Sequence, residues 1–175
     1  MEILSKLSES KIFKNEIILK RNEYLKVQDS IDTKIYFVKS GSVKISIINN
    51  EVDEQIIRFG YENNFVVALD SFISNLKSEY VIQAIKKTNV LVAEKEDFLN
   101  LVYSSAANTK FYIKLLEDLV LQQLEREKDL LIDSPKERFN RVLKRSPQLF
   151  QTIPNKLIAN YLRMSAETFS RLKKS

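Results

Sequence analysis

The side chains best suited to chemistry lie near the C-terminus. Residues 134–175 carry ten Lys and Arg side chains and two acidic ones, a local charge of +8. Residues 1–133 hold 18 basic and 21 acidic residues, a charge of −3. A basic segment on an acidic body is typical of a protein that binds a polyanion, most often nucleic acid. A solvated basic face explains the same charge, so charge alone leaves both interpretations open.

The spacing within this segment predicts two short helices. The first runs over 155–162 and the second over 166–174, where Ser165 is placed to cap the second helix. Two short helices around a three-residue turn form a helix-turn-helix, whose second helix enters the major groove of DNA. In that groove Arg171 would reach guanine with two hydrogen bonds, and Glu167 would accept from cytosine N4. The face expected to be exposed consists of Ala166, Glu167, Ser170, Arg171 and Lys174.

The composition excludes several other classes of chemistry. The chain has no Cys and no His, which removes disulfides, zinc fingers and Cys- or His-dependent catalysis. Its two Gly residues exclude a Gly-rich phosphate loop or dinucleotide fingerprint. We therefore predict no enzyme, no metal and no cofactor. No apolar run approaches the length of a membrane span, so we expect a cytoplasmic protein without a membrane partner.

Residues 16–103 show the pattern of short β-strands. Apolar and polar residues alternate over 43–47, and Gly41 lies between that run and the apolar run 35–38, where a turn needs positive φ. A hairpin turn is expected at 49–51 because Asn tolerates left-handed backbone. Short strands at this spacing predict a small sandwich or barrel. The expected strands are Ile35–Val38, Val43–Ile47, Gln55–Gly60, Tyr80–Ile85 and Val90–Glu94.

Helices are expected on either side of this region. Short ones are predicted over 1–12 and 96–102, and a long one over 108–131 with one wide apolar stripe. That stripe would pair with a second copy of the chain or pack on its own domain. The stripe residues expected to mediate dimerisation are Ile113, Leu116, Val120 and Leu124.

Ser134-Pro135-Lys136-Glu137 has the form of a capping box. Ser134 would accept from the amide of Glu137, and Pro135 would take the first helical position. A new helix therefore begins at residue 135. We predict a hinge and a domain boundary at 132–134.

The segment Ile158–Leu172 resembles the helix-turn-helix of the Crp/Fnr transcription regulators. The family pattern is S-x-E-T-hydrophobic-S/G-R-hydrophobic, which Ser165 to Leu172 match without a gap. Upstream, 35–47 and Phe59-Gly60 resemble the cyclic nucleotide-binding β-roll. Residues 96–102 resemble its closing helix, and 108–131 resemble the dimerisation helix.

The resemblance implies an α+β fold in three parts. These are an N-terminal double-stranded β-helix, or jelly-roll-like β-roll, at 1–107, a long dimerisation helix at 108–133, and a helix-turn-helix domain at 134–175. Many family members add a β-hairpin wing at the end, which is either naturally missing here or truncated.

The family implies a homodimeric regulator on a palindromic operator. Its partners would be double-stranded DNA, a second copy of the chain and RNA polymerase, with an unknown small-molecule effector or none. The residues expected to bind DNA are Ser165, Ala166, Glu167, Thr168, Ser170, Arg171, Lys174 and Lys156. The side chains expected at phosphates are Lys136, Arg138, Lys156, Lys173 and Lys174.

Two positions depart from the family pattern. A gapless comparison anchored on Phe72 puts Val67-Ala68 at the ribose-binding Gly-Glu pair and Ser78-Glu79 at the phosphate-binding Arg-Ser pair. A buried phosphate needs a cation, so we predict that cyclic AMP and cyclic GMP do not bind, although Lys77 could serve an anion. Arg163 takes the turn position where Gly is common, which costs of order 1 kcal/mol if it is left-handed.

The effector remains open at this stage. Val67, Ala68, Ser78 and Glu79 are the candidates for lining a ligand pocket. The apolar residues around 65–68 could hold an apolar small molecule, or they could be strand core. A different class of function is also open, a protein-interaction module or ligand sensor whose helix-turn-helix is degenerate.

Overall fold

The computed structural model describes residues 11–49 and 53–174. The chain divides into two compact units, residues 1–108 and 109–175, which are described separately below. Of the helix expected over 1–12, only residues 11 and 12 are described, and they form a turn. The boundary that we predicted at 132–134 falls inside the second unit.

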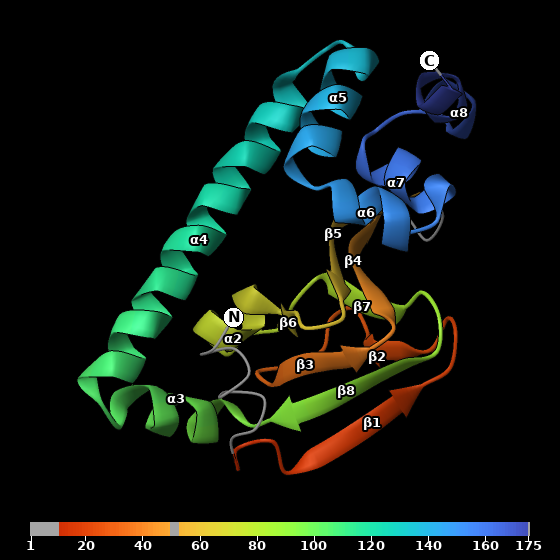
Figure 1. Cartoon of the computed structure of the whole chain (residues 1–175). Helices are drawn as coiled ribbons and strands as arrows, with labels where there is room; N and C mark the ends of the chain where they lie inside the picture. The colour runs from red at the N-terminus through yellow and green to blue at the C-terminus, as the bar shows by residue number, and fades with distance from the viewer. Residues whose placement is uncertain (1–10, 50–52, 175) are drawn as a thin grey trace. The chain divides into compact units, whose positions relative to one another are not determined.

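The first unit is a roll of two antiparallel four-stranded sheets (Figure 1). One sheet has the order β1-β8-β3-β6 and the other β2-β7-β4-β5. All five predicted strands are present, within one or two residues of the expected bounds. The strands are β1 (Asn15–Leu19), β2 (Tyr24–Lys26), β3 (Ile35–Ser40), β4 (Ser42–Asn49), β5 (Asp53–Tyr61), β6 (Phe65–Val66), β7 (Tyr80–Ala84) and β8 (Thr88–Ala93).

The core of the roll lies between the two sheets. It is formed by alternate apolar residues of the central strands, including the fully buried Val38, Val43, Ile82 and Val90. The register places Val38 opposite Val90 and Val43 opposite Ala84. Alternation along each strand therefore directs one apolar row into the core, as the sequence pattern predicted.

Gly41 makes the tight connection between β3 and β4. Its φ is +96°, a region that L side chains rarely adopt, and a Cβ there would lie 2.5 Å from Cα of Thr88. The Thr88 side-chain oxygen in turn accepts from the Ser42 amide at 3.0 Å. The positive φ expected at Gly41 is confirmed.

Strands β1 and β2 and helix α2 (Leu69–Ser74) were not predicted. Both strands lie at sheet edges, and four of the five residues of β1 are exposed. An edge strand with little buried surface carries weak alternation, so its pattern is hard to recognise. The short helix over 96–102 is confirmed as α3 (Lys95–Tyr103).

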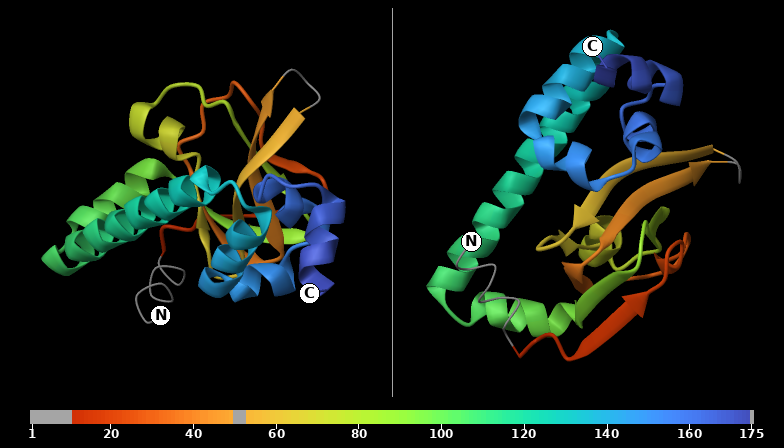
Figure 2. Two further views of the ribbon diagram at one scale, coloured as in Figure 1. Left: turned by 90° about the horizontal axis from the view of Figure 1, so that it is seen from above. Right: turned by 45° about the vertical axis from the view of Figure 1, so that its right-hand side comes forward.

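The long predicted helix is α4 (Ala106–Leu131), which begins at the end of the first unit and forms the start of the second. Shorter helices follow it along the chain (Figure 2). They are α5 (Pro135–Arg145), α6 (Pro147–Thr152), α7 (Asn155–Tyr161) and α8 (Ala166–Lys174).

Three aromatic rings form the centre of the second unit. Phe139, Phe150 and Phe169 lie with centroids 5.2 to 6.1 Å apart. The predicted cap at Ser134 is present, since its side chain accepts from the Glu137 amide with Pro135 in the first turn. The segment around Phe150 forms the helix α6, because Pro147 is well suited to a first helical turn.

No helix in the described ranges is both long enough and apolar enough to cross a membrane. Nor do residues 11–49 and 53–174 contain a cluster of acidic side chains arranged to hold a metal ion.

Candidate nucleic-acid interface

The start of α8 is held by Ser165. Its hydroxyl accepts from the Thr168 amide at 3.1 Å, and its carbonyl accepts from the Phe169 amide at 3.0 Å. This is the cap that the sequence predicted, and it satisfies an amide that the first turn of a helix leaves unpaired. Phe169, which is 1% exposed, anchors the opposite face of α8 in the aromatic core.

The turn between α7 and α8 contains a left-handed arginine. Arg163 has φ +51°, as expected if it replaces a glycine. Its amide donates to the Asn160 carbonyl at 2.9 Å, and the Met164 amide donates to the Ala159 carbonyl at 3.0 Å. These bonds hold a conformation that costs a non-glycine residue of order 1 kcal/mol.

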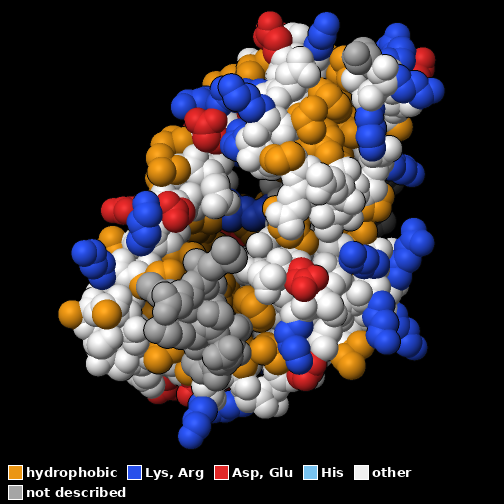
Figure 3. All heavy atoms as spheres, viewed as in Figure 1, with side chains coloured by type: hydrophobic (Ala, Val, Ile, Leu, Met, Phe, Trp, Pro, Cys, Tyr) orange, Lys and Arg blue, Asp and Glu red, His pale blue; other side chains and the backbone are white. Residues whose placement is uncertain are grey.

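The exposed face of α8 is the one predicted from the sequence. Lys and Arg side chains gather over this helix at the upper right of Figure 3. Thr168 is half-buried beside the cap, and Lys156 is exposed on α7. The exposed residues of α8 include all five expected ones, Ala166, Glu167, Ser170, Arg171 and Lys174.

Arg138 is not available to a phosphate, contrary to our expectation. It is 8% exposed, and its guanidinium donates to the carbonyls of Ile132 and, at 3.1 Å, Arg163. Its two terminal nitrogens donate inside the fold, and its Nε is buried without a hydrogen-bond partner. The exposed cations of residues 134–175 that remain outside the ion pairs described next are Lys136, Lys144, Lys156, Arg163, Arg171, Lys173 and Lys174.

A buried ion cluster lies where α4 meets α5. Asp129 is fully buried and accepts from Arg141 Nε at 2.8 Å and from Arg145. Arg141 also pairs with Glu125, one turn earlier on α4. Sequence analysis missed this cluster, yet a signal was present. Glu125 and Asp129 are four residues apart, as are Arg141 and Arg145, so each pair shares a helix face.

The apolar stripe of α4 is largely exposed. The exposed fractions of Ile113, Val120 and Leu124 are 51%, 58% and 45%, and Leu116 is half-buried. Hydrophobic side chains appear among charged ones along α4 in Figure 3. Exposed apolar residues at helical spacing leave the stripe available to a second helix.

The predicted ligand-pocket residues differ in their surroundings. Ala68 is buried at the start of α2, Val67 is half-buried, Ser78 is buried and Glu79 is exposed. The Ser78 carbonyl accepts from the ammonium of Lys26 at 3.1 Å and from the Asp29 amide at 2.9 Å.

Lys26 is a buried cation at this place in the roll. It is 4% exposed, and its ammonium also donates to the carbonyls of Val27 at 2.8 Å and Tyr80 at 2.6 Å. An ammonium has three protons, so carbonyls take all of its donors. Burial lowers the pKa of Lys26, while nearby carboxylates, Asp32 foremost, oppose that effect.

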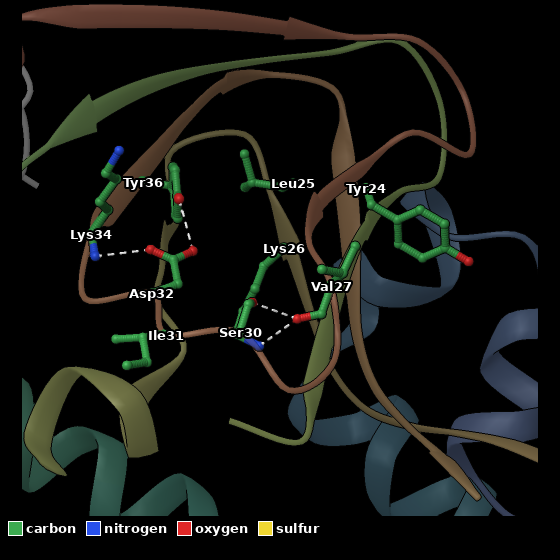
Figure 4. Close-up of a pocket in the computed structure, with 9 residues that line it drawn as sticks. All are labelled: Tyr24, Leu25, Lys26, Val27, Ser30, Ile31, Asp32, Lys34 and Tyr36. Carbon is green, nitrogen blue, oxygen red and sulfur yellow. Dashed lines mark hydrogen bonds between the residues drawn. The ribbon is translucent and has the colours of Figure 1, made fainter. Parts of the chain in front are cut away.

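A shallow pocket of about 310 Å³ opens beside Lys26 (Figure 4). Inside it the Asp32 carboxylate accepts from the Tyr36 hydroxyl at 2.8 Å and from the Lys34 amide at 3.0 Å. The four residues that we expected in a pocket are not among its lining. That lining consists of Tyr24, Leu25, Lys26, Val27, Ser30, Ile31, Asp32, Lys34 and Tyr36.

Comparison with known families identifies the first unit. Residues 16–105 match the cyclic nucleotide-binding domain, which covers the roll from β1 through α3. The chain belongs to the cyclic nucleotide-binding domain family. No curated protein matches the sequence.

Solved structures share the fold of this chain along nearly its whole length. A double mutant of CooA from Carboxydothermus hydrogenoformans has a TM-score of 0.77 at 20% identity, over 99% of this chain and 82% of that one. FixK2 from Bradyrhizobium japonicum has a TM-score of 0.76 at 15% identity, over 91% of this chain and 82% of that one. A protein from Eubacterium rectale, described as a putative transcriptional regulator of the Crp/Fnr family, has a TM-score of 0.66 at 18% identity. The match covers 99% of this chain and 82% of that one. The predicted α+β fold of the Crp/Fnr type is confirmed.

Membership of the cyclic nucleotide-binding family makes the surroundings of Lys26 informative. The sequence comparison expected the phosphate-binding pair at Ser78-Glu79, and Lys26 binds the carbonyl of Ser78 and the carbonyl of Tyr80, the first residue of β7. Among the described residues, Lys26 is the only lysine whose ammonium is bonded to residues 78–80. In this chain, backbone carbonyls accept all three protons of that ammonium.

Proposed function

We propose that this chain is a DNA-binding transcription regulator that acts as a homodimer on a palindromic operator. The observation that carries the proposal is the exposed face of α8. The five side chains predicted to face a major groove are all exposed, while Phe169 on the opposite face is buried. A helix with an anchored apolar face and a polar outer face at this position of a helix-turn-helix is the arrangement that reads base edges.

The roles within α8 follow from side-chain chemistry. Arg171 has the planar fork that recognises guanine, and Glu167 near the start of the helix accepts from cytosine N4. Lys174 and Lys156 are exposed cations suited to phosphates, where they contribute affinity without sequence information.

The dimer would form through α4. Its stripe of Ile113, Leu116, Val120 and Leu124 is wide enough and exposed enough to pair with a second copy. Two recognition helices on a two-fold dimer would lie about one DNA turn, roughly 34 Å, apart. RNA polymerase is a further partner of such a regulator.

For the roll, we propose a sensor or scaffold that does not bind cyclic AMP or cyclic GMP. The support is the saturated ammonium of Lys26 and the acidic Glu79 next to Ser78, where the family has an arginine. An effector would be neutral or apolar, or the roll would act without one.

The test is selection from a random double-stranded DNA library at low and physiological salt, followed by sequencing of bound DNA. We expect a palindrome whose half-sites are about 10 base pairs apart. Arg171→Ala should relax one base position, at a loss of about 1–3 kcal/mol. Lys174→Ala should weaken all sequences alike and reduce the salt slope by about one.

Purely non-specific binding that disappears at physiological salt would contradict the proposal for the free protein. Selection restored by an added small molecule would then indicate an effector-dependent regulator. Failure with every effector tried would favour the protein-interaction module, in which the helix-turn-helix is degenerate.

A further inference from the structure

We infer that the end of α4 and the helix-turn-helix form one rigid body, so that Arg126, Asp129, Arg141 and Arg145 are positioning residues for α8. The inference rests on the proposed function for its effect on DNA, but the rigidity itself concerns the chain alone. It concerns the segment 132–134, where the sequence alone predicted a hinge.

The first connection across that segment is the ion cluster at Asp129. Its carboxylate is fully buried and bonded to two guanidinium groups of α5, from Arg141 and Arg145. Arg145 Nη1 also lies 3.6 Å from the Glu125 carboxylate. Opening a hinge here would leave a buried carboxylate without its partners, which is strongly unfavourable.

The second connection reaches the helix-turn-helix directly. Arg126, three residues before Asp129 on α4, donates from Nη2 to the Tyr161 carbonyl at 2.6 Å. Its guanidinium also lies 3.8 Å from the centre of the Tyr161 ring. Tyr161 is the last residue of α7, so α4 holds the C-terminal end of the helix that precedes the turn.

The third connection holds the turn itself. Arg138 on α5 bridges the Ile132 carbonyl in the linker and the Arg163 carbonyl in the turn, the latter at 3.1 Å. Arg163 is the left-handed residue that positions the start of α8. Linker and turn are therefore tied by one buried side chain.

Together these contacts fix the orientation of α8 relative to α4. A rotation of α4 would rotate α8 by the same amount, because the segment 132–134 would not bend. In a dimer paired through α4, the spacing and phase of the two recognition helices would then be set by the helix pair. The DNA sites accepted by such a protein would show a narrow range of half-site spacings.

Rigidity can be measured without DNA. The chain has no Cys, so Gln122→Cys on α4 and Lys174→Cys on α8 accept spin labels at two defined positions. Labelled protein diluted into excess unlabelled protein places one labelled chain in each dimer. We expect one narrow distance distribution, which Asp129→Asn should broaden. The matched control is Asp118→Asn, an exposed acid on the same helix that pairs only along α4, with Lys114.

Asp129→Asn could unfold the second unit, so Arg145→Gln is the second variant. It removes one partner and keeps the Arg141–Asp129 pair, and far-UV circular dichroism establishes that it is folded. We expect it to broaden the distribution less than Asp129→Asn. A broad distribution in the unchanged chain, or a narrow one in both folded variants, would overturn the inference.

The DNA readout uses the selected palindrome with its spacer lengthened by two base pairs, a rotation of about 70° between half-sites. The unchanged chain should lose about tenfold or more in affinity, and folded Arg145→Gln should lose less than about threefold. Base preference within each half-site should stay the same. If no sequence is selected, the proposed function fails while the distance measurement still decides the rigidity. If the spacing preference of the folded variant equals that of the unchanged chain, the positioning role is wrong.

Discussion

At the residue scale, Lys26 shows how a cation can be present in a ligand-binding fold without being available to a ligand. Its ammonium donates to three backbone carbonyls between 2.6 and 3.1 Å. An incoming phosphate would have to displace those bonds in a site with Asp32 and Asp70 close by. All three ammonium protons of Lys26 are thus already bonded within the protein.

The first prediction follows from these bonds. Cyclic AMP in large excess should produce no heat of binding in isothermal titration calorimetry, either with the unchanged chain or with Lys26→Met. Lys34→Met, which removes the other lysine of the same pocket, is the control. Binding by the unchanged chain that Lys26→Met alone abolishes would show that Lys26 is the phosphate-binding cation.

At the element scale, α4 carries two surfaces of different chemistry. Its apolar stripe is exposed, whereas its last turns hold the buried Arg126 and Asp129. Burying apolar residues contributes about 25 cal/mol per Å², so a partner helix would stabilise the exposed stripe. At the ionic end, Asp129 is paired with α5 and Arg126 with the Tyr161 carbonyl of α7. One helix can therefore serve as a dimer interface and as a support for the helix-turn-helix.

The stripe gives the second prediction. Val120→Glu should shift the protein from dimer to monomer in sedimentation velocity, because the substitution puts a charge in an apolar interface. The matched control is Gln122→Glu, an exposed position about 200° around the helix that gains the same charge. Loss of the dimer in both variants, or in neither, would contradict pairing through the stripe.

The ionic end gives the third prediction, on pH. The hydrogen bond from Lys128, with the charges of Arg141 and Arg145, holds the pKa of Glu125 below 4.5. Folding is therefore stabilised by this carboxylate above pH 4.5, and the contribution is lost as the pH falls through the lower folded value. Denaturant unfolding at decreasing pH should show a smaller loss of stability for Glu125→Gln than for the unchanged chain. Glu127→Gln, exposed on the same helix, should behave like the unchanged chain.

At the scale of the whole molecule, the chain has two cores. The roll is built on Val38, Ile82 and their neighbours, and the second unit on Phe139, Phe150 and Phe169. The two compact units meet near residue 108, inside α4. Each core has its own buried surface, so each unit has its own basis for cooperative unfolding.

The fourth prediction tests that division. Phe169→Ala should destabilise the second unit by about 3 kcal/mol or more, and Ile82→Ala the roll by about 2 kcal/mol or more. In differential scanning calorimetry each substitution should lower one transition and leave the other in place. A single transition that both substitutions lower equally would show one cooperative unit instead.

Local patterns in the sequence determined much of this protein. Gly41, the strand alternation, the Ser134 and Ser165 caps and the outer face of α8 all depend on residues close together in the chain. Their physics is that of backbone conformation and helical or strand period, which a single segment expresses by itself. The left-handed Arg163 was suggested by the resemblance to the Crp/Fnr family, in which Gly is common at that turn position.

Tertiary structure alone decided which charged residues are free. Arg138 and Lys26 read as ordinary cations in the sequence, yet both donate to carbonyls far along the chain, at Arg163 and at Ser78 and Tyr80. Asp residues usually lie at the surface, but Asp129 is fully buried and paired with two arginines of α5. Whether a charge is solvated, paired or saturated depends on partners brought together by folding. The four-residue spacings on α4 and α5 show which residues share a helix face, but not that the two faces meet.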